Sequence, residues 1–157
     1  ANNFIMFKKK EVEYGHNAFE EGIEKIYNNI MAVGQPYSRI IGLSRGGLIP
    51  AVVLSHKLDI PVTPLVWSTR DSGEKEIVEW IPEDLINGAK YLIMDDIVDS
   101  GQTITTLLDS WGKFPRDNIS IASLIYNSDQ ELMVDFFDLS IQRSKDKSWY
   151  KFFWENK

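Results

Sequence analysis

The chain has 157 residues with no cysteine, two histidines and a formal net charge of -6, and 43% of its residues are hydrophobic. Such a composition is typical of a single globular domain over residues 1–157 and excludes general disorder, disulfides and thiolate metal sites. The acidic balance and the lack of a long apolar run argue against nucleic-acid binding and against a membrane span, and we expect a cytoplasmic protein.

The first third of the chain predicts a helix, a strand and a second helix. Apolar side chains recur at helical spacing between Asn17, the predicted N-cap, and Gly34, the predicted terminator. Residues 39–43 form an apolar run typical of a buried strand, the sequence SRGG at 44–47 predicts a tight turn, and 48–58 predict a helix. A strand, a glycine turn and a helix therefore follow one another as one unit.

The remaining elements are shorter and alternate between strand and helix. In chain order they are a strand at 61–67, a mobile loop at 68–76, a short strand at 77–80, a strand at 90–94, a helix at 102–111 and a strand at 119–126. This alternation predicts an α/β fold: a mostly parallel twisted sheet flanked by helices, with sites at the carboxyl ends of the strands. The segment from Met133 onward predicts a small aromatic-rich C-terminal hood, with no clear secondary structure.

The segment 91–103, YLIMDDIVDSGQT, places acids and hydroxyl groups directly after a buried strand. Its last four residues, Ser100, Gly101, Gln102 and Thr103, open the predicted helix. They offer backbone amides, hydroxyl groups and the helix dipole to a bound anion. We expect this loop to bind a phosphate monoester.

Three carboxylates precede the loop. Asp95 and Asp96 end the strand, where they are suited to a ribose diol or to Mg²⁺, and Asp99 falls between the phosphate loop and the group attached to the sugar. The structural alternative is a solvated turn for Asp95 and Asp96 and a helix cap for Asp99. An isolated acidic pair favours that alternative, but the complete pattern of the segment favours ligand binding.

Four apolar residues, DD, two apolar residues and DSGxT together resemble the signature with which type I phosphoribosyltransferases bind 5-phosphoribosyl-1-pyrophosphate (PRPP). Upstream, Ser44, Arg45, Gly46 and Gly47 resemble the pyrophosphate loop of the xanthine-guanine phosphoribosyltransferase family. The glycines allow close backbone approach, and Arg45 provides a cation for pyrophosphate. By itself such a turn is a weak signal, but it lies at the right distance before the PRPP signature.

The resemblance also implies two elements around the base. A flexible catalytic loop would close and exclude water, although its residues also suit a solvated surface loop. A tail with the pattern Trp-x-x-x-x-Trp-acid would close the purine pocket, although Trp149 also suits core or subunit packing. The residues concerned are Ser68, Thr69, Arg70 and Lys75 in the loop, and Trp149, Tyr150 and Glu155 in the tail.

Two features depart from the family pattern. The 6-oxopurine enzymes usually carry a lysine after the strand that corresponds to 119–126, whereas this chain has Asn127 and Ser128 there and no lysine until Lys145. An amide pairs with either an oxo or an amino group, so the identity of the base stays open. Residues 79–83 also lack the basic side chains that the family tends to carry at this point.

The resemblance implies Mg²⁺-dependent transfer of the 5-phosphoribosyl group from PRPP to a purine base of the guanine, xanthine or hypoxanthine class, with release of pyrophosphate. Asp99 would accept the proton of the base and Arg45 would neutralise the leaving group, while Asp95 and Asp96 would hold the sugar and the metal. A homo-oligomer, either a dimer or a tetramer, is expected. The alternative is a non-catalytic protein that senses PRPP or nucleotides on the same fold.

Overall fold

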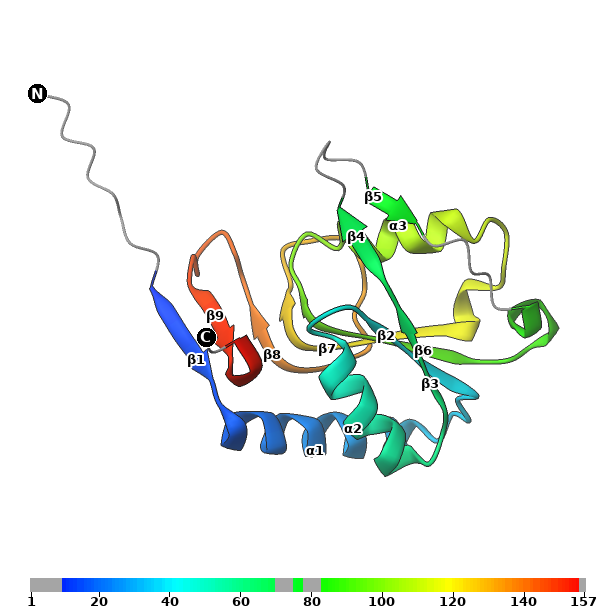
Figure 1. Cartoon of the computed structure of the whole chain (residues 1–157), viewed down its shortest axis with the longest axis horizontal. Helices are drawn as coiled ribbons and strands as arrows, with labels where there is room; N and C mark the ends of the chain where they lie inside the picture. The colour runs from blue at the N-terminus through cyan, green and yellow to red at the C-terminus, as the bar shows by residue number, and fades with distance from the viewer. Residues whose placement is uncertain (1–9, 70–74, 78–82, 156–157) are drawn as a thin grey trace, which may run out of the picture.

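The computed structural model describes residues 10–69, 75–77 and 83–155. Its centre is a five-stranded sheet in which every pair of neighbouring strands is parallel (Figure 1). In spatial order the strands are β3 (Val62–Leu65), β2 (Arg39–Leu43), β6 (Tyr91–Val98), β7 (Ile119–Asn127) and β8 (Phe136–Ile141). The prediction of a mostly parallel α/β sheet is confirmed.

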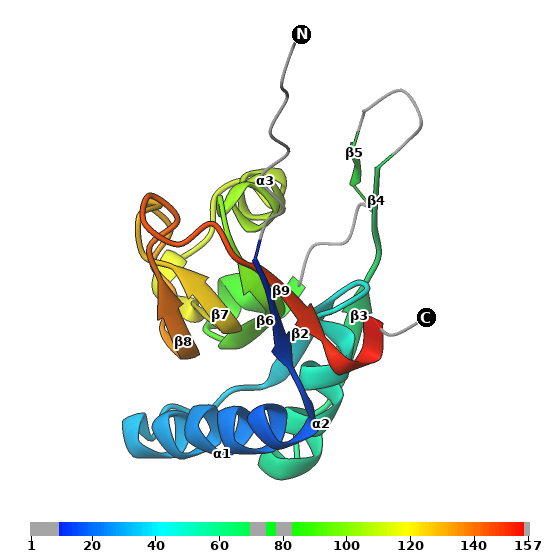
Figure 2. The same ribbon diagram turned by 90° about the vertical axis from the view of Figure 1, so that its left-hand side faces the viewer.

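Helices cover both faces of this sheet. They are α1 (His16–Val33), α2 (Leu48–Leu58) and α3 (Gln102–Ser110). Figure 2 shows α1 and α2 below the sheet and α3 above it. None of the helices within the described residues has the length and apolarity needed to cross a membrane.

The strand β6 contributes to a separate apolar core on each side of the sheet. Leu92 packs in the core that contains Ile26 of α1 and Leu54 of α2, whereas Ile93 packs in the core that contains Leu107 of α3. Successive side chains of a strand point to opposite faces, so a strand covered on both sides must be apolar throughout. This requirement explains the uninterrupted apolar run that precedes the acidic pair.

Smaller elements surround the central sheet. Two strands, β1 (Glu11–Tyr14) and β9 (Trp149–Phe152), pair in parallel, and two others, β4 (Trp67–Thr69) and β5 (Lys75–Ile77), pair in antiparallel fashion. Short 3-10 helices lie at Glu83–Asn87 (η1), Arg116–Asn118 (η2) and Phe153–Glu155 (η3).

Aromatic rings gather where β1 meets β9. The ring centroid of Tyr14 lies 5.3 Å from that of Phe152, which in turn stacks on Trp154 at 4.7 Å. The Tyr14 hydroxyl donates a hydrogen bond to Asp138 at 2.8 Å, which ties this cluster to β8. The predicted aromatic cluster near the C-terminus is confirmed, and it takes the form of a strand followed by a 3-10 turn.

The first helix begins earlier than its sequence suggests. Its N-cap is Gly15 without a side-chain hydrogen bond, and the amide of Phe19 donates to the Gly15 carbonyl at 2.9 Å. The predicted N-cap at Asn17 is therefore wrong by two residues, because Asn17 already lies inside the first turn. The predicted end is confirmed: Gly34 adopts the left-handed conformation with φ of 70°.

The predicted mobile loop at 68–76 is partly regular. Its two ends form the antiparallel pair of β4 and β5, in which Thr69 faces Lys75. Residues 70–74, which include Arg70, lie outside the described residues. The expected short strand at 77–80 coincides with the last residue of β5 at Ile77, and 78–80 are likewise outside the described part of the chain.

Candidate active site

The loop between β6 and α3 forms a cavity of about 120 Å³ at the carboxyl edge of the sheet. It is lined by residues of the acidic segment and of the first turn of the helix: Asp95, Ile97, Val98, Asp99, Ser100, Gly101, Gln102, Thr103 and Ile104. The strand β6 is longer than predicted and continues through the acidic pair to Val98. Every residue predicted for the phosphate loop thus lies on one concave surface.

The start of α3 depends on a glycine. Gly101 is the N-cap, with φ of 76°, and the amide of Gln102 donates to the Ser100 hydroxyl at 3.2 Å. Amides in the first turn of a helix have no partners within the helix, and together with the dipole they attract anions. A side chain at position 101 would meet the Gln130 amide oxygen at 2.6 Å, so the position requires glycine both for its conformation and for its space.

The turn at 44–47 lies directly against the acidic pair. A Cβ atom on Gly46 would lie 1.9 Å from Oδ2 of Asp96, and one on Gly47 would lie 2.6 Å from the Met94 carbonyl oxygen. Arg45, which precedes these glycines and follows a cis peptide bond from Ser44, is exposed. Two motifs that are 50 residues apart are therefore brought together by the pairing of β2 with β6.

The acidic pair is half-buried and locally hydrogen-bonded. The Asp96 amide donates to Oδ1 of Asp95, and the Ile97 amide donates to Oδ1 of Asp96, both at 2.8 Å. Burial raises the pKa of Asp95 well above its ordinary value, and the neighbouring Asp96 carboxylate adds to the shift.

The described residues of the site form no preformed cage for a metal ion. Within the described ranges 10–69, 75–77 and 83–155, no group of three or more His, Cys, Asp or Glu side chains could hold one. Mg²⁺ is commonly bound by one or two carboxylates together with substrate phosphates and water. The pair Asp95 and Asp96 fits that arrangement, in which the substrate supplies the remaining ligands.

Asp99 lies at the mouth of the cavity with its carboxylate 51% exposed. Its Oδ1 accepts a hydrogen bond from Nε of Arg143 at 3.1 Å and a longer one from Nδ2 of Asn127 at 3.4 Å. The same Asn127 nitrogen donates to the backbone carbonyl of Asp99 at 3.1 Å. The carboxylate is therefore oriented from one side and open on the other.

Asn127 has a different environment from the one that the sequence suggested. Its side-chain oxygen accepts from the amides of Asp129 and Arg143, at 3.1 and 3.2 Å, and its side-chain nitrogen is bound to Asp99. Only 6% of its surface is exposed. The amide is thus occupied in joining three loops, and these contacts leave it less able to pair with an oxo or an amino group of a base.

Arg143 is the residue of this site that the sequence analysis missed. It lies two residues after the end of β8, which pairs in parallel with β7 and so delivers it to the same edge of the sheet as Asn127. No strand was predicted after Met133, and without β8 nothing indicated where Arg143 would lie. If β8 had been predicted as a parallel neighbour of β7, Arg143 would have been expected at this edge of the sheet.

The predicted tail is linked to Asp99 through Arg143, whose Nη1 donates to the carbonyl oxygen of Ser148. The next residue, Trp149, is 56% exposed. The Tyr150 hydroxyl donates to Asp146 at 2.9 Å, and hydrogen bonds from Ser148 and then Tyr150 lower the pKa of Asp146 to about 2. Trp149 therefore follows a residue that is tied to Asp99 through Arg143, and its side chain is exposed.

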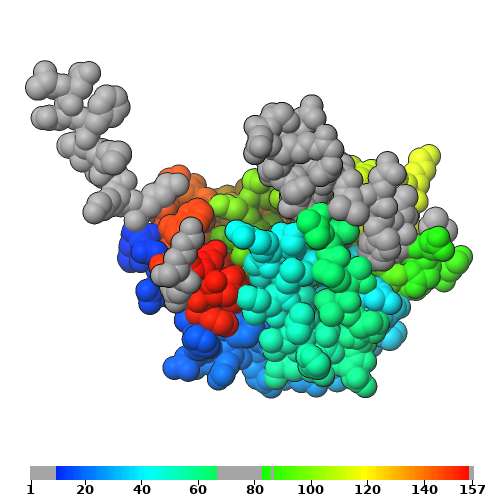
Figure 3. All heavy atoms as spheres, viewed as in Figure 1, coloured from blue at the N-terminus to red at the C-terminus, as the bar shows by residue number. Residues whose placement is uncertain are grey.

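Other predicted residues occupy less informative positions. Glu155 accepts a hydrogen bond from the backbone amide of Phe152 at 3.1 Å, which closes the last turn. In the predicted loop, Ser68 and Thr69 belong to β4 and Lys75 belongs to β5. Figure 3 shows the C-terminal segment in red on the same face of the molecule as the cyan-to-teal segment that contains the 44–58 turn and helix.

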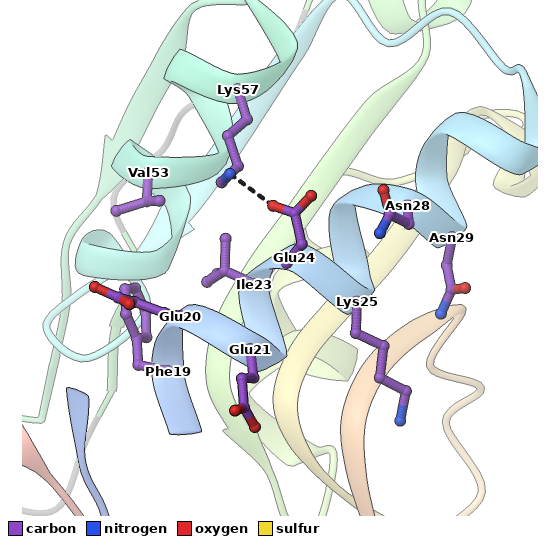
Figure 4. Close-up of a pocket in the computed structure, with 10 residues that line it drawn as sticks. All are labelled: Phe19, Glu20, Glu21, Ile23, Glu24, Lys25, Asn28, Asn29, Val53 and Lys57. Carbon is purple, nitrogen blue, oxygen red and sulfur yellow. Dashed lines mark hydrogen bonds and ion pairs between the residues drawn. The ribbon is translucent and has the colours of Figure 1, made fainter. Parts of the chain in front are cut away.

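A second depression lies away from these motifs. It is a groove of about 930 Å³ between α1 and α2, and an ion pair of 2.8 Å between Lys57 and Glu24 crosses it (Figure 4). None of the predicted site residues lines it. Its larger volume therefore does not make it the better candidate.

Comparison with known proteins agrees with this geometry. The family model for the phosphoribosyl transferase domain matches residues 9–156. Xanthine-guanine phosphoribosyltransferases are similar in sequence: that of Chromohalobacter salexigens is 28% identical over 97 residues (56% of this chain and 58% of the relative), and that of Idiomarina loihiensis is 28% identical over 125 residues (77% and 73%). The match to the first relative thus spans little more than half of its length.

Solved structures show the same fold. A purine phosphoribosyltransferase from Pyrococcus horikoshii has a TM-score of 0.75 at 26% identity, with 94% of this chain and 95% of that chain covered. A xanthine-guanine-hypoxanthine phosphoribosyltransferase from Helicobacter pylori has a TM-score of 0.71 at 20% identity, with 94% of both chains covered.

Proposed function

The chain belongs to the family of phosphoribosyl transferase domains, and on that premise we propose that it transfers the 5-phosphoribosyl group of PRPP to a 6-oxopurine base. In this reaction a bond forms between a base nitrogen and C1′ of the ribose, and the bond from C1′ to pyrophosphate breaks. The proton on the base passes to Asp99. Guanine, xanthine and hypoxanthine are the proposed acceptors, which makes purine salvage the proposed role.

The observation that carries the proposal is the contact between the 44–47 turn and the acidic strand. Gly46 lies directly against the Asp96 carboxylate, and the neighbouring Asp95 lines the cavity that the phosphate loop forms, so the turn and the loop meet the same end of β6. PRPP has a phosphate at one end and a pyrophosphate at the other. Its site therefore needs two anion-binding loops at the same edge of the sheet, with groups that hold the ribose between them. Arg45 is the exposed cation assigned to the pyrophosphate.

Each part of the site has a stated task in the proposed reaction. The loop at 100–103 binds the 5′-phosphate, Asp95 and Asp96 position the ribose, and Asp99 accepts the proton. Positioning supplies much of the rate in such a reaction, because the two reactants are held in a fixed orientation. Trp149 offers its ring to the face of the purine, which adds affinity but little selectivity.

Magnesium would be held by Asp95 and Asp96 together with substrate oxygens, and it would neutralise charge on the leaving pyrophosphate. Because the protein supplies only two carboxylates, Mg²⁺ alone is expected to show no saturable binding in calorimetry. PRPP is expected to bind roughly tenfold more weakly in excess chelator than with Mg²⁺. Tight binding of Mg²⁺ without PRPP would contradict this shared site.

The phosphate loop is tested by Gly101→Val. Its φ of 76° and the nearby Gln130 side chain leave no room for a branched residue, so affinity for inosine 5′-monophosphate (IMP) is expected to fall about tenfold or more. Gly34→Val is the control, because Gly34 has φ of 70° with nothing within 4 Å and does not line the cavity. Unchanged affinity in a folded Gly101→Val protein would contradict the phosphate assignment.

The acceptor base is tested by product formation. The protein is incubated with PRPP, Mg²⁺ and one of hypoxanthine, guanine, xanthine or adenine, and nucleotide products are separated chromatographically. Formation of a monophosphate from at least one 6-oxopurine is expected. A protein that binds PRPP but forms no nucleotide from any of these bases would instead favour the nucleotide-sensing alternative.

A further inference from the structure

A guanidinium group is fixed beside the carboxylate of Asp99. Nε of Arg143 donates to Oδ1 of Asp99 at 3.1 Å, and Nη1 donates to the carbonyl oxygens of Ser148 and, at 3.5 Å, of Asp146. The Arg143 side chain is 21% exposed and lies against Asp99, which lines the cavity. A cation therefore lies next to the proposed proton acceptor in a defined orientation.

The loop that carries Arg143 is held independently of this ion pair. The Arg143 amide donates to the buried Asn127 side chain at 3.2 Å. The next residue, Ser144, donates to the Asp129 carboxylate through both its amide and its hydroxyl, at 2.8 and 2.7 Å. These contacts fix the backbone on both sides of Arg143, and they make the position of the guanidinium a property of the fold.

One nitrogen of the Arg143 guanidinium can still donate a hydrogen bond to a ligand. Nη2 of Arg143 forms no hydrogen bond with any residue in the described part of the chain. An arginine side chain has only donors and stays protonated, so a ligand group beside it must be an acceptor. Oδ2 of Asp99 likewise has no hydrogen bond among the described residues and can face a ligand N–H group.

On the assumption that the proposed function holds, we propose that Arg143 selects the base by requiring a carbonyl group next to the ring nitrogen that faces Asp99. In a purine, the substituent at C6 is adjacent to the N7 edge. A 6-oxo group accepts a hydrogen bond from the guanidinium, whereas a 6-amino group places N–H against N–H. Arg143 on the loop after β8 thus takes the task for which the chain has no lysine after β7.

The inference is tested first with ligands on the unaltered protein. Dissociation constants are measured by calorimetry for IMP, purine riboside 5′-monophosphate and adenosine 5′-monophosphate (AMP), which share the sugar phosphate and the N7 edge and differ in the substituent at C6, with an additional proton on N1 in IMP. We expect IMP to bind most tightly and AMP most weakly, with about a 10- to 100-fold difference between them, as for a hydrogen bond to a charged group. Equal affinity for IMP and AMP would overturn the inference.

The second arm identifies the residue. Arg143→Gln is expected to bring the AMP-to-IMP ratio of dissociation constants close to one, and Arg143→Lys is expected to restore most of the preference. Lys147→Gln is the matched control, because it removes one positive charge from the same loop and has no contact with Asp99. A preference that survives in folded Arg143→Gln, or that disappears in Lys147→Gln, contradicts the assignment.

Failure of the inference is distinguishable from failure of the proposed reaction. Binding of monophosphates requires no turnover, so an Arg143-dependent preference for IMP supports the inference even in a protein that makes no nucleotide. Conversely, nucleotide formation from adenine and hypoxanthine at equal efficiency supports phosphoribosyl transfer and removes the role of Arg143. Melting temperatures of all three variants identify any that do not fold, and the ligand series on the unaltered protein still decides the outcome.

Discussion

Asp99→Asn is expected to lower kcat for nucleotide formation by about 10² to 10⁴ while the affinity for PRPP stays nearly unchanged, because general-base assistance contributes that much to rate. The substitution keeps an oxygen that can accept from Arg143, so the surrounding hydrogen bonds survive. Steady-state kinetics with hypoxanthine give kcat, and calorimetry with PRPP gives the affinity. The split between the two separates proton transfer from binding.

Asp109→Asn is the matched control for this experiment. Asp109 is an exposed carboxylate on the same helix, α3, and does not line the cavity. Its variant should retain the turnover of the parent. If Asp99→Asn also stays within roughly threefold of the parent, a range far below general-base effects, Asp99 serves only as the ion-pair partner of Arg143.

Substitutions at the paired glycines are expected to have unlike effects. Alanine at position 46 would push against the Asp96 carboxylate, so it should displace that group and lower kcat/KM by about 10²-fold, as small misplacements of binding groups do. Alanine at position 47 would meet backbone atoms of Leu43, Met94 and Asp95 between 2.6 and 2.9 Å. Because a backbone cannot rotate away, Gly47→Ala should lower the free energy of unfolding by about 1–3 kcal/mol.

Urea unfolding and steady-state kinetics on both variants test this contrast. We expect Gly46→Ala to keep most of the stability of the parent and to lose activity, whereas Gly47→Ala loses stability first. Gly15→Ala is a useful control because nothing lies within 4 Å of the Cβ position at Gly15. Full activity in Gly46→Ala would show that the close approach to Asp96 has no part in binding substrate.

The sequence allowed the central elements to be predicted where local pattern and tertiary environment agree. The strand at 39–43 and the helix at 48–58 have the predicted bounds. The strand is an apolar run, and the glycine turn at 44–47 separates it from the helix, so both boundaries are marked in the sequence. The start of α1 was misplaced because Asn17 is a good N-cap residue, yet Gly15 takes that position without any side-chain bond. Local preference therefore did not decide this boundary.

The chain after Met133 shows why part of the site could not be predicted. The strand β8 is buried only at its two end residues, Phe136 and Ile141, so its burial does not alternate. The strand β9 is paired with β1, more than 130 residues earlier in the chain. Pairing between distant segments leaves no periodic signal in either of them. Arg143, which depends on β8 for its position, was missed for that reason, and Asn127 was assigned to the base because its buried partners were unknown.

Phosphoribosyl transfer by this protein is tested most directly by the base-dependent release of pyrophosphate from PRPP. The protein is mixed with PRPP and Mg²⁺, and pyrophosphate is followed by a coupled assay with and without hypoxanthine, while IMP is quantified in the same samples. We expect negligible release without the base and, with it, equal amounts of pyrophosphate and IMP. Release at the same rate without the base, or tight PRPP binding without release under either condition, would contradict phosphoribosyl transfer.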